Sequence, residues 1–539
     1  TMNPTELMKE LLKMPVDLIW NGGIGTYVKS SKESHAEVGD RANDTLRVNG
    51  KEVRAKIIGE GGNLGCTQLG RIEYCANGGR MNTDFVDNVG GVDCSDNEVN
   101  IKIFLNTLVA EGELTVKQRN RLLEEMTDEV SDIVIKDCKD QTRTISVTQV
   151  HGVSQLKEQI RFIQYLEKDG KLDRALEFLP TDDDLAERLA NGRALTRPEL
   201  SVLVAYAKMV LKEQLVTPEI TEDAFLSKLL VAYFPKKLQA KYADKMIAHP
   251  LRGEIIATSL ANELVNDMGF NFVQRMQDET GATVAEAAIC YTMAREIFGL
   301  DELTASITDL NGVTPAHVQG EMLHQLRRNM RRACRWFIRH RNRAHDIDQT
   351  VAFFKPVFEQ LKANVDQYMI AAEVKVISAE ITALTKENVP KAVAQVVAKM
   401  STLFSALDIA QIAQIENKSV ELVSETYFKL GAKVELHWFL EQISAQPVAN
   451  HWQALARAAF REELDWQQRA LSSAVLRTCT DTCDADSVIN QWITLNKPLL
   501  ERWYHMLADF KVSQTHEFAK FSVALRELNL LILHCEGQK

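Results

Sequence analysis

Two hydrophobic patterns divide the chain. In the first hundred residues, short apolar runs each end in a cluster of Gly and Asn. Such runs, bounded by turn residues, are typical of buried strands. From about Glu98 onward, apolar positions recur at helical spacing. The pattern predicts a short amphipathic helix, then three short, mostly parallel strands within residues 15–90, then an almost wholly helical chain. The predicted helix covers residues 3–13 and the strands 16–20, 53–58 and 83–86.

Helix starts are well marked in the second part. Thr196 and Glu199 form the ends of a capping box with Pro198 in the first turn. The fold class is therefore mainly α with an N-terminal α/β portion, a partial Rossmann-like parallel sheet followed by a large all-helical region. We expect three domains: an α/β domain at 1–112, a helical domain at 113–350 and a C-terminal helical bundle at 351–539.

The Gly/Asn clusters end the three predicted strands. In a parallel sheet the carboxyl ends of the strands meet at one edge, and ligands bind beyond that edge. Glycine lets a flat ring approach the backbone, because it has no Cβ. An asparagine amide offers a donor and an acceptor, as a carboxamide or ribose partner should. The clusters lie at residues 21–23, 59–63 and 88–91.

Composition narrows the class of protein. The chain has 539 residues, 45% of them hydrophobic, and a net charge of −11, which is a globular profile that does not call for nucleic acid or an anionic membrane. Its apolar runs are shorter than the roughly 18 residues of a membrane-spanning helix. No histidines or cysteines stand at metal-ligand spacing. We expect a cytoplasmic protein with free thiols, no metal, no nucleic-acid partner and no membrane partner.

Five segments resemble the large bacterial NAD-dependent glutamate dehydrogenases, over at least residues 15–345. Parts of two segments, residues 60–63 and 88–95, are also similar to turns of the small hexameric glutamate dehydrogenases. The resemblance implies that residues 1–112 are the C-terminal portion of a dinucleotide-binding domain. It also implies NAD as cofactor, with L-glutamate and 2-oxoglutarate as substrate and product. The five segments are residues 17–27, 59–65, 82–95, 195–200 and 249–252.

The resemblance also implies roles for individual residues. Ser95 would help to hold the distal carboxylate of glutamate, and the strand-end residues would line the cofactor. By position alone Ser95 begins a helical run as a capping box with Glu98, so capping is the alternative role. Glu60 is a candidate acid or base, but a structural hydrogen bond in a tight turn is the simpler role. The cofactor-binding candidates are Asn21, Gly22, Gly23, Gly61, Gly62, Asn63 and Asn88.

No catalytic residue is expected in this chain. The chemistry needs a lysine of lowered pKa and an acidic proton shuttle, which the family carries upstream. The chain also lacks a Gly-x-Gly-x-x-Gly turn for the pyrophosphate. We therefore expect a fragment that supplies one wall of the cleft and is inactive alone. The alternative is a non-catalytic helical module for assembly or regulation, and we expect a homo-oligomer.

Arginines crowd residues 327–343, where Arg328, Arg332, Arg335 and Arg339 share a helical face. A nucleic-acid site would need further basic elements and aromatic residues on the basic face. In an acidic chain, pairing with carboxylates of this chain or of a second copy is the simpler prediction.

Overall fold

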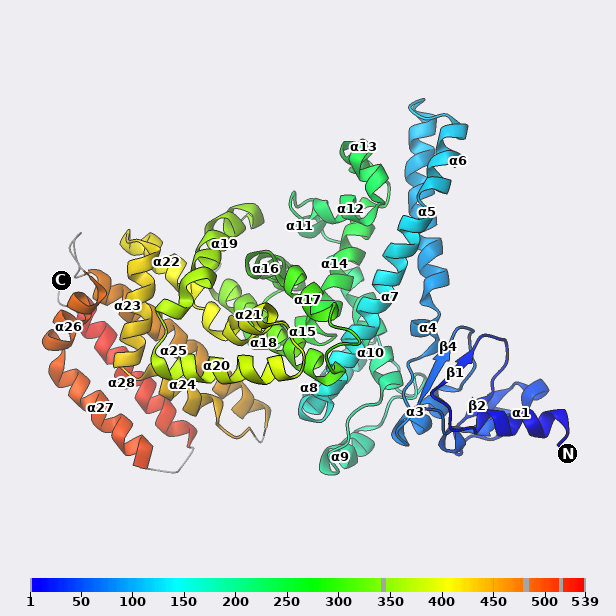
Figure 1. Ribbon diagram of the computed structural model, residues 1–539, viewed down its shortest axis with the longest axis horizontal. Coiled ribbons are helices and arrows are strands. Elements are labelled where there is room, and N and C mark those ends of the chain that lie inside the picture. The colour runs from blue at the N-terminus through cyan, green and yellow to red at the C-terminus, as the bar shows by residue number, and fades with distance from the viewer. Residues whose placement is uncertain (1, 341–345, 449, 478–483, 513–516, 538–539) are drawn as a thin grey trace. The chain divides into compact units, whose positions relative to one another are not determined.

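The computed structural model describes residues 2–340, 346–448, 450–477, 484–512 and 517–537 (Figure 1). The short strands lie near the N-terminus, and helices make up most of the remaining chain. A mainly α chain with an N-terminal α/β portion is thus confirmed.

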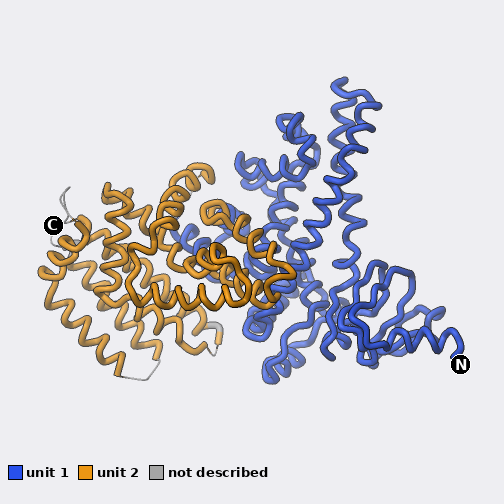
Figure 2. The backbone as a smooth tube through the Cα atoms, in the orientation of Figure 1, with its two compact units in different colours: residues 1–292, 330–340 blue, residues 293–329, 341–539 orange. Residues whose placement is uncertain are grey.

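The chain forms two compact units, coloured separately in Figure 2. Unit 1 comprises residues 1–292 and 330–340, and unit 2 comprises residues 293–329 and 341–539. The long helices α16 (Val284–Phe298) and α18 (Ala316–His340) contribute residues to both. This division does not test the predicted domain boundaries at residues 112 and 350, which stay a prediction.

The strands of unit 1 form two parallel pairs. β1 (Leu18–Asn21) pairs with β4 (Ile57–Glu60), and β2 (Val28–Lys29) pairs with β3 (Val48–Asn49). The first two predicted strands are confirmed in kind, although each begins later than expected. Their buried side chains pack on helix α3 (Gln68–Ala76) through Tyr74. This small core holds the ends of β1 and β4 in place.

The third predicted strand, at residues 83–86, is wrong. One residue, Arg80, bridges to β4, with the Ile58 N–H donating to its carbonyl oxygen at 3.0 Å. The chain then turns into the short helix α4 (Asp84–Asp87), in which the Asp87 N–H bonds to the Thr83 carbonyl oxygen. Asp84 and Asp87 accept hydrogen bonds from backbone N–H groups at residues 60 and 64, which a strand at this place would not provide.

The helical start expected near Glu98 is also earlier in the structure. Helix α5 (Val89–Ala110) follows α4 directly, so Gly90 and Gly91 are helical and form no turn. Gly90 lies against Val134 of α7 (Thr127–Val150), and the packing of α5 on α7 extends the helix to its glycine-rich end. Ser95 therefore stands inside α5 and does not begin it.

In unit 1, helices α10 (Arg197–Leu215) and α14 (Arg252–Met268) pack on each other. Thr196 and Glu199 form the predicted capping box at the start of α10. The other helices are α1 Pro4–Leu12, α2 His35–Val38, α6 Val116–Glu125, α8 Gly152–Lys168, α9 Asp182–Ala190, α11 Pro218–Thr221, α12 Ser227–Tyr233, α13 Lys236–Met246 and α15 Phe272–Thr280. Helices α3, α7, α11, α12 and α15 pack on one or both of α10 and α14.

The arginine-rich helix α18 makes the predicted kind of pairing at Arg335. Its guanidinium donates to Glu279 of α15 at 2.7 Å. Although burial raises it, the pKa of Glu279 is lowered to about 2 by the charges of Arg275, Arg335 and Arg331. Arg341 and Arg343 lie outside the described residues.

The described residues of unit 2 form helices joined by turns, with no strand among them. Its C-terminal part has an aromatic core in which Phe439 lies 5.8 Å from Trp503 between ring centroids. Its helices are α17 Leu300–Thr308, α19 Ile347–Asn364, α20 Ala371–Lys386, α21 Lys391–Leu403, α22 Ala406–Glu416, α23 Val420–Lys433, α24 Leu436–Ser444, α25 His451–Arg477, α26 Ala485–Leu495, α27 Lys497–Val512 and α28 Phe518–Gly537.

A membrane-spanning helix would have to be both long and apolar. Among the described residues no single helix meets both conditions. One bent pair of helices, Lys391–Leu403 with Ala406–Glu416, meets them when the two are taken together, judged by length and composition alone.

His249 joins two parts of unit 1. Its buried ring accepts a hydrogen bond at Nδ1 from the Leu251 N–H, 3.0 Å away. Because Nδ1 accepts, the proton sits on Nε2, which donates to the Asn100 carbonyl oxygen of α5 at 3.1 Å. Burial lowers the pKa of His249, so the neutral ring is the folded form.

We predict that His249→Gln loses about 1 kcal/mol of unfolding free energy at pH 7.5, the net value of one hydrogen bond. The folded ring has the lower pKa, so the unfolded chain binds the proton first as pH falls through the ordinary value of 6.5. The stability that His249 contributes is then lost. Urea unfolding at pH 7.5, 6.5 and 5.5 should show the gap between the proteins closing. A gap that is constant or widens would contradict this.

Candidate functional site

The carboxyl ends of β1 and β4 lie side by side. The strands run in register, with Asn21 opposite Glu60. Beyond them, the N–H groups of Gly61 and Gly62 donate to the Asn21 carbonyl oxygen at 2.8 and 3.1 Å. Two of the three predicted clusters therefore form one continuous edge.

Glycine is required where these two turns meet. A Cβ on Gly62 would lie 2.7 Å from the Gly23 carbonyl oxygen, a backbone atom that cannot move aside cheaply. The indole of Trp20 covers Gly59 and Gly61, and a Cβ on either would lie 2.7 Å from the ring. Trp20 is nevertheless 63% exposed. The edge thus combines bare backbone with an accessible aromatic face.

The third cluster reaches the same edge through Asn88. Its side-chain amide donates to the Asn63 side-chain oxygen. Asn88 precedes α5 but makes no side-chain capping bond to it. Its amide is therefore directed at the neighbouring turn, and the three clusters that the sequence placed at strand ends are brought together. Whether they line one cleft stays a prediction.

Beneath this edge lies a buried ion pair. Glu60 is fully buried, and both its oxygens accept from Arg71 of α3, at 2.7 and 3.0 Å. The same guanidinium lies 3.2 Å from Asp84 of α4. Burial raises the pKa of Glu60, and the Arg71 hydrogen bonds counteract that shift. Glu60 is thus in the structural role that the sequence favoured over acid or base.

Two aspartates of α4 hold the turn at both ends. Asp87 accepts from the Glu60 N–H at 3.0 Å, and Asp84 accepts from the Leu64 N–H at 2.8 Å. Leu64 has a positive φ of 60°, which is uncommon for a residue other than glycine, and the bond to Asp84 stabilises it. The backbone that carries residues 61–63 is therefore fixed by carboxylates.

Ser95 lies two turns into α5, on an exposed side of the helix. Its hydroxyl donates to the Gly91 carbonyl oxygen at 3.1 Å, a bond within its own helix. The predicted N-cap role is wrong, because the helix begins at Val89. A contact with substrate is untested by these observations and stays a prediction.

Known proteins match the chain along nearly its whole length. The family described as "Bacterial NAD-glutamate dehydrogenase, catalytic domain" matches residues 1–148, and "Glutamate dehydrogenase, C-terminal" matches residues 192–530. The chain belongs to the glutamate dehydrogenase C-terminal family. The match extends well beyond residue 345, where the resemblance seen in the sequence ended.

Three relatives named "NAD-specific glutamate dehydrogenase" measure the similarity. The chain is 45% identical to the Pseudomonas aeruginosa protein and covers 32% of it, 43% identical to that of Halomonas elongata, covering 33%, and 35% identical to that of Mycobacterium tuberculosis, covering 32%. Each match includes at least 97% of this chain. The chain therefore spans about a third of the length of these relatives.

Glutamate dehydrogenase chemistry needs a lysine, and two in unit 1 are notable. Lys29 is buried, and its ammonium donates to Asn49 and to two backbone oxygens, which makes it structural. Burial lowers the pKa of Lys208 to about 8, and burial raises that of nearby Asp93 to about 6. On α5, Asp93 and Ser95 are about 200° apart around the helix. Lys208 thus lies on the face away from Ser95.

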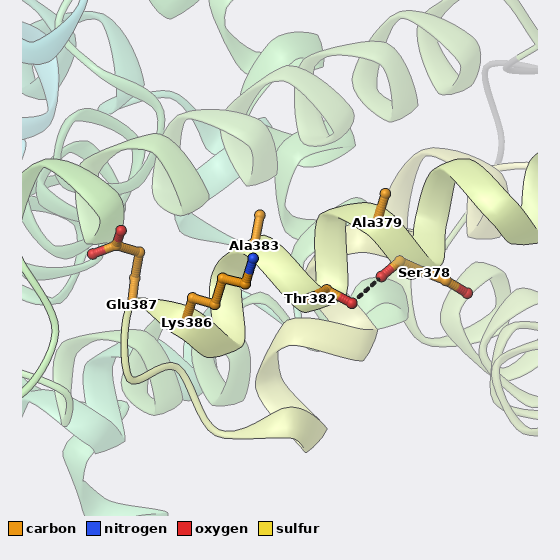
Figure 3. Close-up of a pocket in the computed structure, with 6 residues that line it drawn as sticks. All are labelled: Ser378, Ala379, Thr382, Ala383, Lys386 and Glu387. Carbon is orange, nitrogen blue, oxygen red and sulfur yellow. Dashed lines mark hydrogen bonds between the residues drawn. The ribbon is translucent and has the colours of Figure 1, made fainter.

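A surface pocket in unit 2 contains none of the predicted residues. Figure 3 shows Ser378, Ala379, Thr382, Ala383, Lys386 and Glu387, which line it from α20 and its end. The hydroxyl of Thr382 donates to the Ser378 carbonyl oxygen within the helix. The pocket is lined by a single helix and its end and lies outside the region matched by the catalytic-domain family, so the strand ends remain the candidate site.

Sequence reasoning missed the residues that support the site. Arg71, Asn82 and Arg197 each bond to a group at or behind the strand-end turns. Asn82 and Arg197 lie inside two of the segments that carry the resemblance, 82–95 and 195–200, but their partners are 5 and 115 residues away, so no local pattern assigned them a role. Arg197 alone stood out in principle, since a cation in the first turn of a helix opposes the helix dipole.

We predict that Glu60→Gln costs about 3 kcal/mol of unfolding free energy, because it leaves the buried Arg71 with only part of its charge partner. Urea unfolding at pH 7 measures the loss. Asp17→Asn is the matched control: Asp17 pairs with Lys56 at the other end of the same strands, fully in solvent. That exposed pair should contribute less than about 1 kcal/mol. Equal effects of the two substitutions would contradict the assigned role of Glu60.

Proposed function

We propose that this chain forms part of an NAD-dependent glutamate dehydrogenase and contributes one wall of its coenzyme and substrate site. The reaction converts L-glutamate, NAD⁺ and water to 2-oxoglutarate, ammonium, NADH and a proton. The observation that carries the proposal is the meeting of residues 21–23, 61–63 and Asn88 at one sheet edge, within the region matched by the catalytic-domain family.

The residues at this edge fit the nicotinamide end of the coenzyme. The amides of Asn63 and Asn88 offer donors and acceptors that match a carboxamide. The backbone of Gly23 has open space where a Cβ would stand, with nothing within 4 Å, so a flat ring can approach it there. When bound, NAD supplies the hydride acceptor. The residues of this chain bind the coenzyme and orient its nicotinamide ring.

The substrate side of the proposal rests on α5. Asn88 and Ser95 belong to one rigid segment, so a contact at the turn and a contact on the helix keep a fixed spacing. Ser95 is exposed on α5, and its hydroxyl donates to the Gly91 carbonyl oxygen of the same helix, so a carboxylate can reach it from solvent. We propose that Ser95 donates to the distal carboxylate of glutamate.

The proposed enzyme needs more than this chain. The relatives are about three times as long, and we expect the catalytic lysine and the pyrophosphate turn in that other part, so this chain alone should be inactive. The apolar side chains of Leu18, Trp20 and Ile57 are exposed along β1 and β4, and we propose that the rest of the protein covers them. A homo-oligomer, a cytoplasmic location and the absence of nucleic-acid and membrane partners stay predictions. So does the alternative of a helical assembly module.

We predict that Asn88→Ala in the full-length protein lowers kcat/KM for NAD about ten-fold, as loss of one specific hydrogen bond would. Its unfolding free energy should change little, because Asn88 does not cap α5. Glutamate-dependent NADH formation, followed by absorbance, and thermal unfolding measure the two effects. A full-length parent protein that forms no NADH from glutamate would leave only the assembly module.

Thr115→Ala is the matched control for Asn88→Ala. Thr115 is a true N-cap, of α6, with a capping box to Gln118. Its loss should cost about 1 kcal/mol of stability and leave kinetics unchanged. The reverse result, with Asn88→Ala altering stability but not kcat/KM, would show that the strand-end contact is structural.

We predict that Ser95→Ala raises the KM for glutamate about ten-fold or more, because a charge-assisted hydrogen bond is lost. The matched control is Ser131→Ala, since Ser131 makes the same bond to the residue four before it, on α7. Steady-state kinetics with varied glutamate compare them. The same KM in both variants would end the role of Ser95 in substrate binding.

A further inference from the structure

Arg197 occupies a costly position. It is the first residue of α10, where the positive end of the helix dipole repels a cation. Burial lowers its pKa. Glu199 completes the cap with Thr196 and pairs with Arg188 through two bonds of 2.8 Å. The helix start is therefore complete without the guanidinium of Arg197.

The guanidinium of Arg197 is directed at neutral partners. Nε and Nη2 donate to the Asn82 side-chain oxygen at 3.0 and 2.8 Å. Nη1 donates to Ser146 at 3.0 Å and to Gln149 at 3.3 Å, both on α7. Among its contacts with described residues there is no direct ion pair. A half-buried charge that is satisfied only by amides and a hydroxyl gains little stability for its desolvation.

Asn82 links Arg197 to Asp87 by hydrogen bonds on both sides of its amide group. Its oxygen accepts from Arg197, so its amide nitrogen points the other way and donates to Asp87 at 2.8 Å. The second oxygen of Asp87 accepts from the Glu60 N–H at 3.0 Å. Asp87 also immediately precedes Asn88 in the chain. One chain of hydrogen bonds thus runs from α10 to both turns of the site.

We propose that Arg197 is a positioning residue for the coenzyme: through Asn82 and Asp87 it sets the turn at residues 60–63 and the amide of Asn88. The inference rests on the proposed function. It gives the region matched by the C-terminal family a direct part in the geometry of the catalytic-domain region, because Arg197 belongs to the first and Asn82 to the second.

Two substitutions in the full-length protein test the proposal, and a third serves as their control. Arg197→Ala should raise the KM for NAD about ten-fold and the KM for glutamate less than about two-fold, since Ser95 is not on this chain of bonds. Asn82→Asp should act like Arg197→Ala. It strengthens the pairing with Arg197 but removes the donor to Asp87 and sets two carboxylates together. A merely structural Arg197 would tolerate it.

Arg188→Gln is the matched control at the same helix start. It removes the partner of the buried Glu199 but touches neither Asn82 nor Asp87. It should lower the thermal midpoint and leave both KM values unchanged, the opposite of what Arg197→Ala does. In the double variant Arg197→Ala/Asn82→Asp, the rise in KM for NAD should be no greater than in either single variant.

The possible results distinguish a failure of the role of Arg197 from a failure of the proposed function. An active enzyme in which Arg197→Ala leaves the KM for NAD unchanged overturns the inference alone. Equal rises in both KM values together with a lower thermal midpoint also overturn it, because they indicate a structural residue. A full-length protein that does not reduce NAD with glutamate overturns the proposed function and the inference together.

Discussion

The rest of the site depends on the buried pairing of Glu60 with Arg71. A carboxylate at the end of β4 has no water to solvate it, so it must be neutralised inside the protein. Arg71 of α3 neutralises the Glu60 carboxylate, and the same guanidinium also forms an ion pair with Asp84. Breaking such a pair is expensive, which makes the arrangement of β4, α3 and α4 nearly fixed. A two-stranded parallel sheet would not hold that arrangement by itself.

The charges and the amides of this region have different places. Glu60, Asp84 and Asp87 are turned inward, where they hold backbone N–H groups and Arg71. The side chains of Asn63 and Asn88 meet on the outside of the turn. Carboxylates provide rigidity, while neutral amides leave the outer surface uncharged. Such a division suits a ligand with a neutral ring, because an exposed carboxylate would compete for its donor groups.

Local patterns in the sequence predicted the elements whose ends are marked by strong turn residues, such as β1, β4 and the capped start of α10. They failed at residues 83–86, where an apolar run of that length does not distinguish strand from helix. They failed again at Gly90 and Gly91, since glycine usually ends a helix and here packs at its start. The meeting of the first two clusters was predictable because the ends of paired parallel strands share an edge, whereas Asn88 reaches that edge from the start of a helix. The pairing of Arg197 with Asn82, 115 residues apart, was not predictable.

The helical part of unit 1 is therefore more than an attachment to the α/β part. α5 carries Asn88 and Ser95 on one rigid axis, α7 packs along it, and α10 presents Arg197 to the loop before α4. Helices of this length are held in place by packing along one face, as α5 is on α7. The strands at the N-terminus are too short to be held in this way. The helices behind the strand-end turns thus determine where those turns lie. A change in α10 should therefore alter the geometry of the sheet edge more than it alters the stability of the fold.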